Sequence, residues 1–131
     1  SHKQVQEKLK TFGLRPDGAD ALVMELIQAN FLNEARFSSA FSRGKFNIKG
    51  WGKIKIKQHL KMHQVSEYNI KNALSEISES DYLNSFETIV SKKWKALKGE
   101  NALHKKQKLV RFMYSRGFES QLTYAFLQGK K

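Results

Sequence analysis

A short pattern recurs three times along the chain, at intervals of 51 and 53 residues. The three segments start at Val5, Ile56 and Leu109, and they read VQEKLKTFGL, IKQHLKMHQV and LVRFMYSRGF. In each segment two apolar residues stand four positions apart, a Gly or Gln follows at the expected helix end, and another apolar residue comes next. A unit of this length suits three helices and can bury its apolar face only against a neighbour. The repeat therefore predicts an elongated, curved array of tandem three-helix units.

Apolar residues elsewhere in the chain also follow a helical spacing. The single proline, Pro16, lies in a turn sequence, and the small number of turn residues argues against a many-stranded fold. We predict an all-α protein of about eight helices, in repeat units at residues 1–45, 46–98 and 99–131. The expected helices are Val5–Phe12, one that starts at Asp20, Asn33 to about Gly44, about Ile54–Leu60, one capped by Ser66, Asp81–Leu97, about Ala102–Gly117, and Leu122–Leu127.

The chain is strongly basic, with 24 Lys and Arg against 12 Asp and Glu and a formal net charge of +12. The excess is concentrated in two runs. Lys45–Lys61 holds six lysines and no acid, and Lys92–Arg116 holds nine basic residues and one acid. Such surfaces favour a polyanion, which includes nucleic acid, an anionic membrane surface and an acidic protein groove. Lysines outnumber arginines by 19 to 5, which suits contact with phosphates better than readout of base edges.

From these runs we select twelve candidate contacts with nucleic acid or with a protein filament on it. They are Lys45, Lys49, Lys53, Lys55, Lys57, Lys61, Lys92, Lys93, Lys105, Lys106, Lys108 and Arg111. Lys53, Lys57 and Lys61 are four residues apart and would form a stripe on one helix. Trp51 stands between two glycines beside these lysines, and it would either stack on a base or wedge between repeats. The remaining aromatics at helical spacing are expected in the core: Phe37, Trp94, Phe112, Phe118 and Phe126.

The sequence lacks the residues and motifs that several kinds of catalytic and metal site require. The chain has no Cys, which excludes disulfides, Cys-ligated zinc and thiol catalysis. His59 and His63 are four residues apart, but no carboxylate lies within their helix and no HExxH motif occurs. No phosphate-binding glycine loop, nucleophile elbow or long apolar span is present. We therefore expect a protein that is not an enzyme, has no metal, cofactor or small-molecule substrate, and does not enter a membrane.

In order along the chain, several segments resemble the RecX regulatory proteins of bacteria. VQEKLKTFGL from Val5 is similar to the first-repeat helix with its glycine stop, and KLVRFMYSRGF from Lys108 is similar to the third-repeat signature. The other matching segments are NFLNEARFSSAFSR from Asn30, GWGKIKIKQHL from Gly50 and VSEYNIKNALSEI from Val65. The chain departs from the family at an acidic pair, where Asn33 precedes Glu34. It also starts just before the first repeat helix, whereas family members usually carry a further N-terminal helix.

The resemblance implies a function that composition and spacing do not reach. It implies a cytoplasmic, non-catalytic protein that binds the RecA filament on single-stranded DNA and also contacts phosphates. Such binding would inhibit the recombinase and co-protease activities of RecA, and so modulate DNA repair, recombination and the SOS response. The residues alone leave two alternatives open. One is a general basic DNA-binding helical module without RecA dependence, and the other is a helical-repeat adaptor for an acidic protein.

Overall fold

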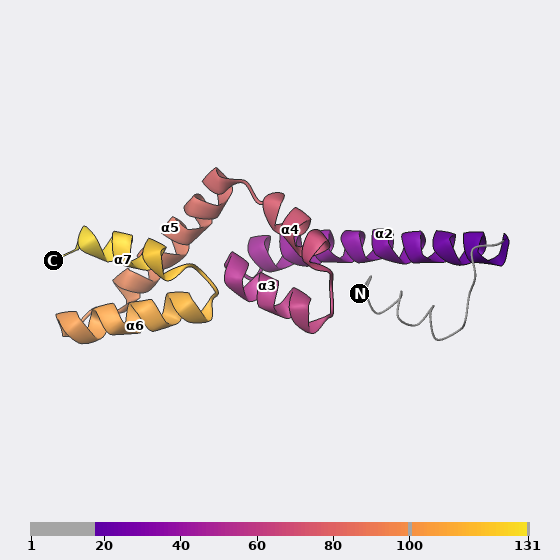
Figure 1. Ribbon diagram of the computed structural model, residues 1–131. Helices are drawn as coiled ribbons and strands as arrows, with labels where there is room; N and C mark the ends of the chain where they lie inside the picture. The colour runs from indigo at the N-terminus through magenta and orange to yellow at the C-terminus, as the bar shows by residue number, and fades with distance from the viewer. Residues whose placement is uncertain (1–17, 100, 131) are drawn as a thin grey trace.

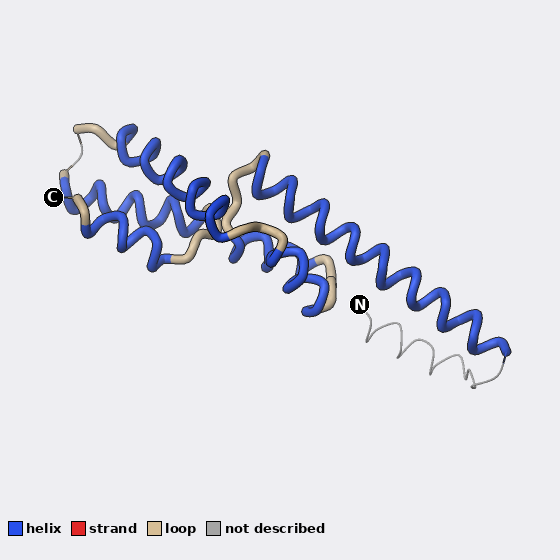
Figure 2. Tube along the Cα trace, turned by 90° about the horizontal axis from the view of Figure 1, so that it is seen from above, coloured by secondary structure: helices blue, strands red, loops and turns tan. Residues whose placement is uncertain are grey.

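In the computed structural model, residues 18–99 and 101–130 are described, and they form six α-helices and no strand. The helices are α2 (Gly18–Asn47), α3 (Lys53–Met62), α4 (Glu67–Ser75), α5 (Glu79–Ala96), α6 (Ala102–Ser115) and α7 (Ser120–Gln128). Two views at right angles show them spread along one long axis, with α2 at one end and α6 and α7 at the other (Figure 1, Figure 2). The predicted all-α class and the elongated helical array are confirmed.

The helices form two groups that are consecutive in the sequence. In the first unit, α3 and α4 pack on each other and on α2; in the second unit, α6 packs on both α5 and α7. The first part of α2 extends beyond α3 and α4 (Figure 1), and Leu22, Met24 and Leu26 are more than half exposed there. The helix expected at Val5–Phe12 lies outside the described residues.

The prediction of two helices between Asp20 and Gly44 is wrong, because α2 is one continuous helix of 30 residues. Asn30 and Asn33 suggest a boundary by residue type, but each costs a helix only about 0.7 kcal/mol relative to alanine. Packing against α3 and α4 outweighs that cost. The predicted helix end near Gly44 is also wrong, because α2 continues to Asn47. Gly44 lies inside the helix, and a Cβ there would meet no atom other than the helix's own backbone within 4 Å.

Side-chain caps define where the later helices begin. Ser66 caps α4 as predicted, because its hydroxyl accepts the Asn69 N–H at 3.2 Å. The prediction that Asp81 caps α5 is wrong, since Ser78 stands at the cap and its hydroxyl accepts the Asp81 N–H at 3.1 Å. Asp81 lies in the first turn instead, where the helix dipole favours a negative charge.

The repeated helix-end position has the same backbone geometry in both described units. Gln64 after α3 has φ 60° and Gly117 after α6 has φ 90°. In each case the next residue donates its N–H back to the last turn, from Val65 to Leu60 O at 3.1 Å and from Phe118 to Met113 O at 3.2 Å. This pairing is the Schellman motif, which ends a helix through a left-handed residue. The sequence repeat therefore corresponds to a repeated helix C-terminus, in which the Gly or Gln position takes the left-handed conformation.

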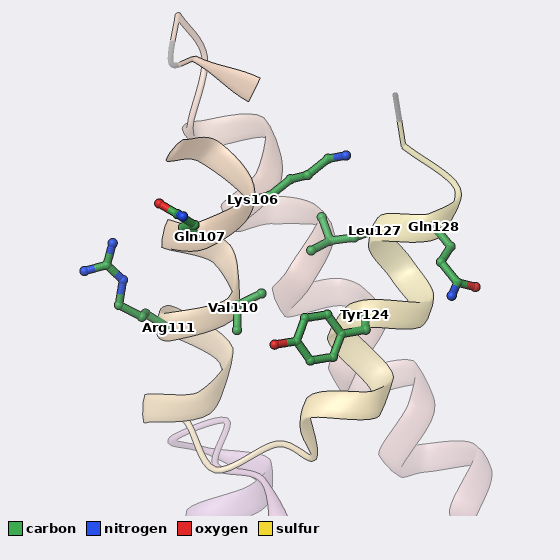
Figure 3. Close-up of a pocket in the computed structure, with 7 residues that line it drawn as sticks. All are labelled: Lys106, Gln107, Val110, Arg111, Tyr124, Leu127 and Gln128. Carbon is green, nitrogen blue, oxygen red and sulfur yellow. The ribbon is translucent and has the colours of Figure 1, made fainter. Parts of the chain in front are cut away.

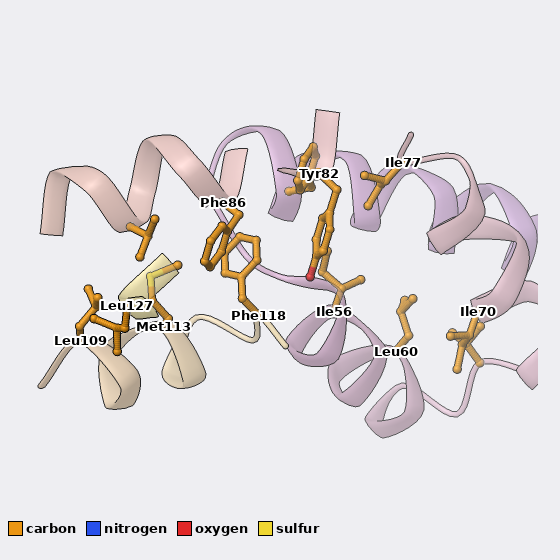
Figure 4. Packing of buried hydrophobic residues seen from close by; sticks show 13 residues of the cluster. Ile56, Leu60, Ile70, Ile77, Tyr82, Phe86, Leu109, Met113, Phe118 and Leu127 are labelled. Carbon is orange, nitrogen blue, oxygen red and sulfur yellow. The ribbon is translucent and has the colours of Figure 1, made fainter. Parts of the chain in front are cut away.

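One apolar core runs through both units (Figure 4). Ile56 and Leu60 of α3 are fully buried, as are Leu109 and Met113 of α6. An aromatic layer joins the two groups, since the Phe46 ring of α2 stacks on the Tyr82 ring of α5 with 6.0 Å between their centroids. On the other side of this layer, Tyr82 and Phe86 lie 5.3 and 5.6 Å, centroid to centroid, from Phe118. Phe118 is thus in the core as expected. Phe37 is not, because 43% of it is exposed.

The start of α3 is held by the second unit. Gly52, at the N-cap, offers no side chain, and its N–H donates to Arg116 O at 2.7 Å. The N–H of Lys53 donates to the Tyr82 hydroxyl at 2.9 Å, and that of Ile54 to Gly117 O at 3.0 Å. The first backbone N–H groups of a helix have no acceptor within that helix. Here the C-terminal end of α6 supplies acceptors, so the positive end of the α3 dipole lies against the negative end of the α6 dipole.

This backbone approach requires glycine on both sides. A Cβ at Gly52 would overlap the carbonyl of Gly117, and a Cβ at Gly117 would overlap the backbone of Lys55. Tyr82 completes the junction, since its hydroxyl donates to the Glu119 carboxylate. Burial raises the pKa of that hydroxyl far above its ordinary value, and the Glu119 carboxylate raises it further. The phenol therefore stays protonated across the physiological range.

Glu34 ties α4 to α2. Its Oε1 accepts the Ser66 N–H at 2.7 Å and a hydrogen from the Asn69 amide at 3.1 Å. The same Asn69 amide, which is 2% exposed, also donates to Phe31 O at 3.3 Å. Partial burial alone would raise the pKa of the Glu34 carboxyl, but hydrogen bonds from Ser66 and Asn69 outweigh it and hold that pKa below its ordinary value of 4.5.

We predict opposite effects for two glycine-to-alanine changes. Gly52→Ala should lower the free energy of unfolding by about 1–3 kcal/mol, because the new methyl group forces the two units apart. Gly44→Ala should raise it by about 0.5–1 kcal/mol, because Gly44 lies inside a helix with open space around it. Urea unfolding of both variants measures this. Equal stability of the two variants would contradict the close approach at Gly52.

We also predict an acid-dependent contribution from Glu34. A carboxyl whose folded pKa is lowered stabilises the fold fully above its unfolded pKa, and the contribution is lost as the pH falls through the folded pKa. Glu34→Gln should therefore destabilise the protein by about 1 kcal/mol at pH 7, and the difference from the unmodified chain should shrink below about pH 4.5. Urea unfolding at a series of pH values tests this. Glu25→Gln, on an exposed residue of the same helix, is the control and should show little change.

Candidate nucleic-acid interface

The structure places Trp51 between the end of α2 and α3. Its ring lies 4.6 Å from the His59 ring and 6.3 Å from that of Phe41, centroid to centroid. The ammonium groups of Lys45 and Lys55 lie 4.8 and 4.4 Å from its centroid. The indole therefore packs within the first unit and holds two of the candidate cations by cation–π attraction. Trp51 is only partly buried, and its two predicted roles, stacking on a base and wedging between repeats, both stay predictions.

The predicted stripe on α3 divides between two places. Lys57 and Lys61 line a hollow of about 340 Å³ between α3 and α4, and Lys71 of α4 joins them there. Lys53 faces the second unit instead, with its ammonium 4.9 Å from the Tyr82 ring. Glu79 and Glu119 line the hollow that contains Lys53. The cause is the docking of the α3 N-terminus, which turns its first residue toward the junction.

Aromatic side chains also position cations in the second unit. The ammonium of Lys105 lies 3.9 Å from the Trp94 ring, and that of Lys93 lies 4.6 Å from the Phe112 ring. Arg116 lies over the same Phe112 at 5.2 Å, and its Nη1 donates to Lys49 O at 2.7 Å. Trp94 and Phe112 are partly buried, so they pack on the core with one part and support a positive charge with another.

The other candidates lie on the outer surface or in one groove. Lys49, Lys92 and Lys108 are exposed. Lys106 and Arg111 line a groove of about 980 Å³ between α6 and α7, together with Tyr124 and Leu127 (Figure 3). The twelve candidates thus do not form one continuous stripe. They are distributed over both units in several small basic groups.

Sequence reasoning missed three basic residues that the fold brings beside the candidate lysines or over an aromatic ring. Lys71 joins Lys57 and Lys61, Arg116 joins Lys93 at Phe112, and Lys130 lies 4.9 Å from the Phe126 ring. Only the packing of one helix on another brings Lys71 to α3, so no local pattern could have found it. Arg116 had a local signal, because it immediately precedes the helix-ending Gly117.

A metal-binding cluster is absent from the part of the chain that the structure describes. There, no three His, Cys, Asp or Glu residues lie close enough to hold a metal ion. His63 instead packs against aromatic rings, with its ring centroid 5.4 Å from that of Phe37 and 5.8 Å from that of Phe41. None of the described helices has both the length and the apolar character needed to cross a membrane.

Two family models match the chain in succession. The second three-helix domain of RecX matches residues 33–74, and the third three-helix domain of RecX matches residues 79–129. These ranges agree with the α2–α3–α4 and α5–α6–α7 groups. They differ from the expected units 1–45, 46–98 and 99–131, whose bounds stay a prediction.

Comparison with curated proteins agrees with the family models. Regulatory protein RecX of Prosthecochloris aestuarii is 29% identical over 122 residues, which are 92% of this chain and 78% of that protein. The Clostridium botulinum protein of the same name is 31% identical over 90% of this chain and 56% of its own length. Regulatory protein RecX of Leuconostoc mesenteroides is 26% identical over 88% of this chain. This chain spans only 43% of the length of that protein.

Solved structures show the same fold. The crystal structure of RecX from Lactobacillus salivarius aligns with a TM-score of 0.70 over 98% of this chain and 84% of that one, at 18% identity.

Taken together, the fold and its basic surfaces define a helical-repeat protein whose three-helix units hold cations on aromatic rings. The chain belongs to the RecX family of regulatory proteins.

Proposed function

We propose that this protein is a non-catalytic regulator of RecA that binds the RecA filament on single-stranded DNA and inhibits its recombinase and co-protease activities. The observation that carries the proposal is the match of both described units to successive RecX domains. The relatives bear the name regulatory protein RecX. In this proposal the protein acts in the cytoplasm and modulates DNA repair, recombination and the SOS response.

The physical character of the chain supports a long polyanionic partner. A net charge of +12 attracts phosphates at a distance, and the elongated array spreads its basic groups over both units. Several of the lysines are held over aromatic rings, which limits the freedom they lose on binding. A filament groove built of protein and nucleic acid would meet such a surface at several points.

The first test is a titration into a RecA ATPase assay that depends on single-stranded DNA, at near-physiological salt. A parallel titration measures binding to the same DNA without RecA. We expect inhibition well below the concentration that coats bare DNA, because the filament is the proposed target. Inhibition only where the DNA is already coated would support a general DNA-binding protein instead. Binding to RecA that survives nuclease treatment would support an adaptor for a protein surface.

A pair of charge variants tests the part played by the α3–α4 hollow. Lys57→Gln with Lys61→Gln removes two positive charges without placing new acids beside Glu67, which lines the same hollow. We expect the concentration for half-inhibition to rise roughly 2- to 30-fold, as removal of two weak ion pairs would give. Lys95→Gln with Lys98→Gln is the control, since both residues are exposed and belong to none of the groups above. Equal effects of the two pairs would mean that only net charge matters.

A further inference from the structure

A large hollow lies between α6 and α7. Its volume of about 980 Å³ is at the upper end of the range for ligand pockets, and it is open to solvent. Val110 of α6 and Tyr124 of α7 point toward each other across it, and Leu127 points in from α7 (Figure 3). Leu127 is nearly buried, whereas 54% of Tyr124 is exposed. The groove therefore has a small apolar floor and one accessible aromatic ring.

The rim of this groove is basic and polar. Lys106 and Arg111 supply two positive charges from α6, and Gln107 and Gln128 supply amides that can both donate and accept hydrogen bonds. None of the described residues that line it is acidic. Three smaller hollows also contain candidate lysines. Glu67 lines one of them, and Glu79 and Glu119 line another. The third, around Lys49 and Arg116, has no acidic lining residue, but its one aromatic ring, that of Phe46, is buried. The α6–α7 groove is thus well suited to an anion.

Tyr124 also differs from the other aromatic rings near the basic groups. Six rings in the described chain each have a Lys or Arg over them: Phe41, Trp51, Tyr82, Trp94, Phe112 and Phe126. All six belong to the core or are packed against it. Tyr124 instead exposes more than half of its surface in the groove. A flat ligand could therefore stack on it without first displacing the core.

We propose that the α6–α7 groove binds one or more nucleotides of single-stranded nucleic acid. A base stacks on Tyr124 above the Val110 and Leu127 floor, Lys106 and Arg111 contact the flanking phosphates, and the two glutamines face the base edges. Aromatic stacking combined with a cationic rim is how proteins hold single strands without strict sequence preference. An acidic protein segment could pair its carboxylates with Lys106 and Arg111. Its carboxylates would not stack on the exposed Tyr124 ring, however, and the apolar floor is too small to bury a large apolar side chain. The inference rests on the proposed function and names its contact with the single strand.

The test compares two probes and two tyrosines. The probes are an oligo(dT) strand and a strand of equal length that is abasic, so that it keeps the phosphates and loses the bases. Tyr124→Ala should weaken oligo(dT) binding roughly 5- to 100-fold, which is the range for removal of one stacked base, and should leave abasic binding unchanged. Tyr114→Ala is the control, because Tyr114 is 65% exposed on α6 and does not line the groove. Fluorescence anisotropy measures the affinities of the unmodified chain and of both variants for the two strands.

Two further variants separate stacking from charge and from misfolding. Tyr124→Phe keeps the ring and should bind oligo(dT) nearly as the unmodified chain does. Lys106→Gln with Arg111→Gln should weaken binding to both strands and reduce the salt dependence of log K by about 1.4, or 0.7 for each phosphate that is no longer neutralised on a single strand. If Tyr124→Ala does not fold, the charge pair still tests the groove on folded protein, because its unchanged binding to both strands would overturn the proposal.

Failure of the groove and failure of the proposed function give different results in these experiments. Unchanged oligo(dT) binding by folded Tyr124→Ala, or an equal weakening on both strands, would overturn the nucleotide groove. Loss of RecA inhibition by that variant with unchanged DNA affinity would assign the groove to a protein surface and would also overturn it. Failure of the unmodified chain to inhibit the RecA ATPase would overturn the proposed function and leave the groove result standing.

Discussion

The contact between the Gly52 and Gly117 backbones determines how the two units meet. It supplies partners for the first amides of α3 and brings the negative end of α6 against the positive end of α3. The aromatic layer around Tyr82 and Phe118 could not close if either glycine carried a side chain. The direction of Lys53 also follows from it, because the docked helix end turns that residue away from the other lysines of α3. The distribution of positive charge therefore depends on a junction that is made mainly of backbone hydrogen bonds and aromatic rings.

Much of the fold was predictable because its signals are local. The repeat revealed both described helix ends, Gln64 and Gly117, and Ser66 was a recognisable cap. The continuity of α2 was not predictable from Asn30 and Asn33, because helix propensity is a small effect that packing against α3 and α4 overrides. Ser78 was overlooked for a related reason, since Asp81 is an equally good capping residue by type. Which of the two residues caps α5 depends on where the backbone enters the helix, and residue type does not show this.

The candidate site was less predictable than the fold. The two basic runs were visible in the sequence, but their division into groups depends on residues far apart in the chain. Lys71 reaches Lys57 through the packing of α4 on α3, and Arg116 reaches Lys49 across 67 residues. The interpretation of the aromatic residues as core was only half right. Phe112 and Trp94 do pack on the core, but each also supports a cation, and no spacing rule distinguishes a purely buried ring from one that does both.

Because lysines lie over its two indole rings, the tryptophan fluorescence of the chain should respond to anions that bind those lysines. The chain contains only two tryptophans, and the structure puts one in each unit. Trp51 lies against Lys45 and Lys55, and Trp94 lies against Lys105, so each indole is next to lysines on the surface of its own unit. Any anion that draws those ammonium groups away changes the local field at the indole. Chains with a single tryptophan, at 51 or at 94, would therefore emit differently according to which unit is occupied.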